Sequence, residues 1–110
     1  MSAKFVLRKS SNGQFHFHLQ AANGESILQS EMYTSKSSAE NGIASVRTNA
    51  PLDERYERKN AKNGQPMFNL KAANHEIIGT SETYSSVAAR EQGIASVKAN
   101  APKAPLDDQT

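Results

Sequence analysis

The feature that most constrains the fold of this chain is an internal repeat. When the 110-residue sequence is shifted by 51 positions against itself, roughly half of the aligned positions are identical and no gap is needed. The identical runs include Asn-Gly-Gln at 12–14 and 63–65, Ala-Ala-Asn at 21–23 and 72–74, and Gly-Ile-Ala-Ser-Val at 42–46 and 93–97. The chain is therefore predicted to contain two copies of one structural unit, residues 1–51 and residues 52–102.

Each unit has the pattern of three short strands followed by one helix. Asn12-Gly13 is typical of a tight hairpin turn and separates the first two strands. The second strand alternates between apolar residues at 15, 17, 19 and 21 and polar residues at 16, 18 and 20, which indicates a half-buried strand. Asn23-Gly24 predicts a second hairpin turn. In the second unit, His75 takes the place of that glycine.

A helix is predicted after the third strand of each unit. Ser35 and Ser86 are suitable N-caps, because a serine hydroxyl accepts hydrogen bonds from the free amides of a first helical turn. Small and apolar residues then recur every three or four positions and form one stripe. A glycine lies on this stripe in both units, which indicates a close approach to the sheet. Asn49 and Asn100 are predicted to end the helices in a left-handed conformation.

Length and composition favour one domain, residues 1–110, in which both units share a core. A unit of about fifty residues folded alone would bury only ~60% of the surface that its unfolded chain exposes. The chain is therefore expected to be a pseudo-dimeric monomer. Residues 103–110 follow the second unit without a strand or helix pattern and are predicted to form a loosely ordered tail.

Composition also excludes several classes of function. The chain has no cysteine, which excludes disulfides, thiolate metal sites and thiol nucleophiles. Its formal charge is +2 with both signs interspersed, a weak argument for nucleic acid. No apolar run approaches the ~18 residues that a membrane span needs. A cytoplasmic protein with no membrane contact and no cofactor is predicted.

The repeated motifs resemble those of the YegP-like family of small bacterial and archaeal proteins. The resemblance rests on Asn-Gly-Gln, the aromatic strand, Ala-Ala-Asn, Ser-Glu-x-Tyr-Ser-Ser in the second unit, and Gly-Ile-Ala-Ser-Val. It implies an α+β fold in which β-β-β-α units build one continuous antiparallel sheet and exchange the strands that follow the helices. Both helices are expected on one face of that sheet. The resemblance implies no activity and no catalytic or binding residues.

Two histidines form the first candidate site. His16 and His18 lie two residues apart on one strand, so both imidazoles project from the same face, as two ligands of a zinc site could. The second unit has Met67 and Asn69 at these positions. Solvent-facing strand residues are therefore favoured over a metal site.

A repeated polar cluster forms the second candidate site. Ser30, Glu31 and Tyr33 recur as Ser81, Glu82 and Tyr84 between the third strand and the helix of each unit. The cluster could mark a ligand site. A structural role is favoured, because these side chains can satisfy backbone groups at the start of a helix.

The face of the sheet opposite the helices is the third candidate. It is predicted to carry His16, His18, Arg8, Lys59 and Lys71. The favoured hypothesis is a non-enzymatic interaction module that binds a protein or peptide partner on this open, polar face. Single-stranded nucleic acid is an alternative, although its readers expose aromatic side chains for base stacking and the aromatics here are predicted to face inward. A small-ligand or enzyme site at the seam between the units is the other alternative.

Overall fold

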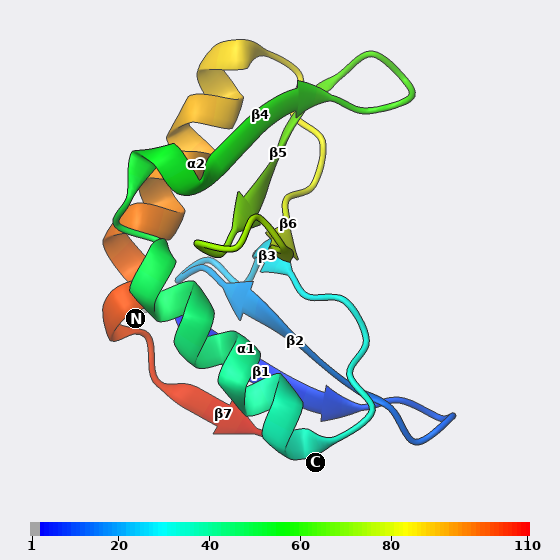
Figure 1. The fold of residues 1–110 in the computed structure, drawn as a ribbon. Coiled ribbons are helices and arrows are strands. Elements are labelled where there is room, and N and C mark those ends of the chain that lie inside the picture. Colours follow the sequence, from blue (N-terminus) through cyan, green and yellow to red (C-terminus); the bar gives the residue numbers. More distant parts are fainter. Residues whose placement is uncertain (1–2) are drawn as a thin grey trace.

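The computed structural model describes residues 3–110, which form one seven-stranded sheet and two α-helices (Figure 1). In the first repeat the elements are β1 (Lys4–Lys9), β2 (Phe15–Gln20), β3 (Ser26–Gln29) and α1 (Lys36–Asn49). In the second repeat they are β4 (Tyr56–Asn60), β5 (Pro66–Lys71), β6 (Ile77–Thr80) and α2 (Val87–Asn100). Short 3-10 helices, η1 (Asp53–Arg55) and η2 (Ala101–Lys103), follow the α-helices, and β7 (Leu106–Asp108) comes last. The predicted α+β class with two β-β-β-α repeats is confirmed.

The two repeats meet at the centre of the sheet. The strand order is β4-β5-β6-β3-β2-β1-β7, and β3 and β6 run antiparallel to each other. The pair that registers between them is Gln29 with Thr80, which are equivalent residues of the two repeats. A pseudo-two-fold axis therefore passes through this pair. The β3–β6 contact is called the seam below.

The end of the chain differs from the sequence prediction. Residues 103–110 were expected to be a loosely ordered tail and the sheet to be antiparallel throughout, but β7 pairs with β1 in parallel, so the sheet is mixed. The Phe5 amide donates to the Pro105 carbonyl at 2.8 Å, and the Gln109 amide donates to the Leu7 carbonyl at 2.9 Å. These bonds satisfy the outer backbone groups of β1, which would otherwise form an open sheet edge. A three-residue strand among prolines and aspartates carries no alternation by which to recognise it.

The helices cover one face of the sheet, as predicted. Their apolar stripes join the inward side chains of the strands in a single buried cluster to which both repeats contribute. Its largest fully buried members are Phe5, Phe17 and Phe68. Both serine caps are present, with the Ser38 amide donating to Ser35 Oγ and the Ala89 amide to Ser86 Oγ, each at 3.1 Å.

The helix ends differ from the sequence prediction in one respect. Neither Asn49 nor Asn100 adopts a left-handed conformation, and Asn100 has φ −101°. Instead, each amide group donates to a carbonyl one turn back in its helix, Asn49 Nδ2 to Ser45 O and Asn100 Nδ2 to Ser96 O, both at 2.8 Å. The non-glycine residue that does have a positive φ in residues 3–110 is His75, at 70°, in the hairpin turn where it replaces glycine.

The seam is asymmetric on its helix side. Leu28 of β3 is buried, and the equivalent residue of β6 is Gly79. A Cβ atom added to Gly79 would lie 2.7 Å from both Cγ and Cδ2 of Leu28. The leucine of the first repeat thus fills the space that a second leucine would need.

Candidate functional site

The helix-free face of the sheet is built by the side chains that alternate with the core. On β2, Phe17 and Leu19 are buried, so His16 and His18 project to the opposite face. Arg8 lies beside His16 on β1, and Gln29 lies beside His18 on β3. The structure therefore brings the two histidines and Arg8 together, as the sequence predicted.

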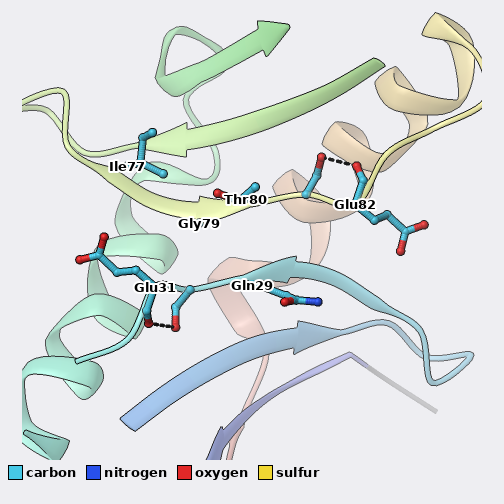
Figure 2. Close-up of a pocket in the computed structure, with 8 residues that line it drawn as sticks. Gln29, Glu31, Ile77, Gly79, Thr80 and Glu82 are labelled. Atoms are coloured by element: carbon cyan, nitrogen blue, oxygen red, sulfur yellow. Dashed lines mark hydrogen bonds between the residues drawn. The ribbon is translucent and has the colours of Figure 1, made fainter. Parts of the chain in front are cut away.

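A groove crosses this face at the seam. It has a volume of about 440 Å³ and runs between β3 and β6 (Figure 2). Gln29 and Thr80 lie at its middle, Glu31 and Ile77 at one end, and Glu82 toward the other. The two strands that border it register through the single pair Gln29 and Thr80. Neither glutamate takes part in any ion pair between residues 3 and 110.

A second hollow of about 260 Å³ adjoins the groove on the first repeat. It shares Gln29 and Ser30 with the groove and is otherwise lined by Arg8, His16, Phe17, His18 and Ser26. Partial burial lowers the pKa of His18, and the charges of Arg8, His16 and Lys4 lower it further. The surroundings of His18 are therefore electropositive. We call this space the histidine hollow.

The same place on the second repeat has different chemistry. Met67 replaces His16 and Ile77 replaces Ser26, so two polar positions become apolar. Asn69, which replaces His18, is buried; its Nδ2 donates to Glu57 Oε1 at 3.0 Å and its Oδ1 accepts from Thr80 Oγ1 at 2.9 Å. Lys71 Nζ completes this network with Glu57 Oε2 at 3.1 Å. The polar groups of the second repeat are thus bonded to each other.

The sequence predicts that Lys59 and Lys71 both add positive charge to the open face, but their surroundings in the structure differ. Lys71 is neutralised by Glu57, whose pKa is lowered by hydrogen bonds from Asn69 and Lys71. Lys59 lies opposite Met67 on β4 and β5, at the position equivalent to Arg8, and like Arg8 it is two strands away from the seam. Within residues 3–110 each repeat therefore has one open-face cation without an ion pair, Arg8 or Lys59, and the two histidines lie beside Arg8 alone.

The repeated serines serve the backbone. Ser30 Oγ accepts from the Phe17 amide at 2.9 Å and donates to the Glu31 carbonyl at 2.7 Å. Ser81 Oγ makes the same two bonds, with Phe68 and Glu82, at the same distances. Both hydroxyls hold the strand end against its neighbour and are not free to act as nucleophiles.

The repeated tyrosines pack into the core. Tyr33 stacks on Phe17 and Tyr84 on Phe68, with ring centroids 6.1 and 6.3 Å apart. Their hydroxyls lie against the helical glycines, and a Cβ on Gly42 would approach Tyr33 Oη to 2.5 Å. The close approach predicted at these glycines is therefore made by a tyrosine. Burial raises the pKa of both phenols, so neither is suited to proton transfer near neutral pH.

The sequence also raises the questions of a metal site at His16 and His18 and of a membrane span. Within residues 3–110, His16 and His18 belong to no group of three or more His, Cys, Asp or Glu side chains that could hold a metal ion. The described part of the chain also contains no helix long and apolar enough to cross a membrane.

Sequence reasoning missed three residues of this face: Ser26, Gln29 and Thr80. Gln29 and Thr80 are not identical between the repeats, so a search for shared positions passes over them. The signal that could have found them is the pseudo-two-fold symmetry itself, because an antiparallel seam must bring equivalent residues together.

Fold and open face together define a class: small α+β proteins in which two tandem repeats form one sheet with helices on a single side. A family model described as a domain of unknown function, DUF1508, matches residues 10–57 and again residues 61–108. The second match includes β7, and the first ends within β4. The chain belongs to the UPF0339 family, of which YegP is a member.

Relatives of the same length support this assignment. The chain is 60% identical to the UPF0339 protein YegP of Escherichia coli K12 over 110 residues, which is all of both chains. It is 58% identical over its full length to a UPF0339 protein of Shewanella oneidensis. The predicted resemblance to the YegP-like family is confirmed.

Solved structures of relatives have the same fold. The solution NMR structure of E. coli yegP, a protein of unknown function, matches with a TM-score of 0.93 at 60% identity and covers 100% of this chain and 95% of that one. The NMR structure of the Shewanella oneidensis UPF0339 protein matches with a TM-score of 0.91 and covers 98% and 92%. These relatives carry no stated activity.

Proposed function

We propose that this chain is a binding protein that holds a peptide or a protein segment on the helix-free face of its sheet. The observation that carries the proposal is the continuity of the seam groove and the histidine hollow, which share Gln29 and Ser30. Together they offer an elongated depression with an acidic part at the seam and a basic part on the first repeat. An extended peptide fits such a shape better than a compact small molecule does.

The state of the repeated polar residues favours binding over catalysis. A catalytic site needs a nucleophile or an acid–base group that is free to react. Ser30 and Ser81 are fully engaged with the backbone, and Tyr33 and Tyr84 face the core. The groove therefore offers recognition groups, chiefly the amide of Gln29 and the two glutamates.

The same face favours a peptide over single-stranded nucleic acid. Phe5, Phe17 and Phe68 are buried on the helix side and cannot stack on bases. Glu31 and Glu82 at the groove would repel phosphates.

The test is a selection followed by mapping. A random peptide library displayed on phage is panned on the full chain, and the selected peptide is titrated into ¹⁵N-labelled protein. We expect amide shifts around Gln29, Thr80 and the two glutamates. Gln29→Trp places a bulky side chain where the groove and the hollow meet and should abolish binding. Glu40→Trp, at an exposed position of α1, should leave binding unchanged.

Two results would overturn the proposal. One is selected peptides whose shifts map to α1 and α2 and which bind Gln29→Trp as well as the original chain. The other is tight binding of labelled single-stranded oligonucleotides that strengthens at low salt, since phosphate contacts release counterions.

A further inference from the structure

The histidine hollow gathers hydrogen-bond donors without an acceptor partner. Arg8 lines it and takes part in no ion pair between residues 3 and 110. Ser26 Oγ, at the same hollow, is shielded from solvent and has no hydrogen-bond partner. Tyr84 Oη in the core is unpaired in the same way, so Ser26 Oγ by itself does not indicate a ligand.

The charges around the hollow have one predominant sign. His18 faces Arg8, His16 and Lys4, and each of these lowers its pKa, so the neighbouring charges that it senses are positive. The nearby carboxylate is Asp107 of β7, which is bonded to Lys4 at 2.9 Å and to Gln109 at 3.0 Å. Lys4 and Asp107 are thus paired. The charge of Arg8 also lowers the pKa of Asp107, but Arg8 forms no ion pair with it between residues 3 and 110 and is available to a ligand.

The second repeat shows that the fold does not need these donors. At equivalent positions it has Met67, Asn69 and Ile77 in place of His16, His18 and Ser26, and the strands keep the same pairing. The hydrogen-bond donors at these positions of the first repeat are therefore not required for folding. Arginine, imidazole, hydroxyl and amide groups around one hollow are the set that recognises an oxyanion.

We infer that the histidine hollow binds a carboxylate carried by an acidic side chain of the peptide partner, with Arg8 as its permanent cation and Gln29 as a neutral donor. This inference rests on the proposed function and adds the chemistry of the partner. An acidic residue of the peptide would lie at the first repeat, and a basic residue two or more positions away would lie at the seam near Glu31 and Glu82. The two charges would fix the direction of the peptide.

The test uses acetate as the probe for a carboxylate and inorganic phosphate as the probe for a free oxyanion. Each is titrated into the full chain against sodium chloride at matched ionic strength and fixed pH, while the ring signals of His16 and His18 are followed by NMR. We expect saturable shifts at both rings and at Ser26. Arg8→Gln should weaken acetate binding about tenfold or more. Lys59→Gln, the equivalent change in the second repeat, should not alter it.

Other results separate this inference from the proposed function. If shifts are linear in concentration, spread over all lysines and equal in Arg8→Gln, the probes only screen charge and the oxyanion site is overturned. If selected peptides bind the open face but exchange of their Asp or Glu for the amide changes nothing, the inference falls and the proposed function stands. If acetate binds saturably but no peptide binds this face, the oxyanion site stands and the proposed peptide-binding function falls. Phosphate binding more than about tenfold tighter than acetate would assign the site to a free oxyanion and overturn the peptide carboxylate.

Discussion

The two repeats share their strands, turns and helix caps, but their outer edges differ. In the first repeat, β7 covers β1, and Leu7 is fully buried. In the second repeat, β4 is at the edge of the sheet, and Arg58, at the position equivalent to Leu7, bonds Asp53 and Glu91. A charged side chain on an uncovered edge strand discourages pairing with another molecule. Where the environment of equivalent positions differs, the residues differ with it.

The two repeats also differ in the side chains that they place on the open face. Here the backbones of the two repeats are alike, yet one repeat has Arg8, two histidines and an unpaired serine, while the other has an internally bonded network. The edge explains Leu7 and Arg58, but no difference in folding explains His16 and His18. The difference between the repeats therefore separates residues that serve the fold from residues available for binding.

The seam offers the largest expected effect on stability. Gly79→Leu would place a side chain where Leu28 already lies, and overpacking of this kind should lower the free energy of unfolding by about 3 kcal/mol. Urea denaturation measures it. The double variant Leu28→Ala/Gly79→Leu should recover at least half of the loss. Additive losses in the double variant would show that the two residues do not share one space.

The covered edge comes next. Deleting residues 104–110 removes the buried Ala104 and the backbone hydrogen bonds between β7 and β1, and should cost about 2–3 kcal/mol. The shortened chain should also self-associate, because β1 would present an open edge flanked by apolar side chains. Sedimentation of the two chains measures association. A shortened chain that is as stable as the full one would contradict the claim that β7 stabilises the protein by covering β1.

Replacing the helical glycines with alanine should lower the stability of the protein, which is opposite to the usual effect of this substitution. Gly→Ala inside a helix ordinarily stabilises by ~1 kcal/mol. Here a Cβ on Gly93 would overlap Tyr84 Oη, so Gly93→Ala should destabilise by about 1–2 kcal/mol. Gly42→Ala should behave alike in the first repeat, where Tyr33 and Phe17 are the obstacles. Thermal unfolding distinguishes this from the ordinary gain in melting temperature.

The smallest effect concerns pH. The pKa of His18 is lowered in the folded chain, so the unfolded chain binds a proton more readily. Stability should be complete above about pH 6.5 and decrease as the pH falls below it, by less than about 1 kcal/mol because the ring is partly exposed. His18→Asn should flatten this dependence, and His75→Asn in the opposite repeat should not. An unchanged slope in His18→Asn would contradict the assignment.

The sequence predicted much of the fold because its signals were local and written twice. Asn-Gly turns, the alternation of β2 and the serine caps each need only a few neighbouring residues, and their recurrence after 51 positions excluded chance. Strand β7 escaped prediction because its stability comes from β1, about a hundred residues away in the chain. Asn49 was misassigned because its side chain bonds back into the helix, an option that composition does not distinguish from a left-handed cap.

The candidate site was predictable in part for the same reason. Alternation placed His16 and His18 on the open face, and register then placed Arg8 beside them. Gln29, Thr80 and Ser26 depend on how β3 meets β6, which is a long-range pairing with one registered pair. Nothing in the neighbourhood of these residues in the sequence indicates that pairing.

The most direct test of the division between fold and binding is to give the first repeat the residues of the second. In the variant His16→Met/His18→Asn/Ser26→Ile, the affinity for a peptide selected on the original chain is measured by calorimetry. We predict a loss of about tenfold or more in affinity, with a free energy of unfolding within about 1 kcal/mol of the original. Unchanged affinity in a folded variant would contradict the claim that the open face of the first repeat is the binding surface.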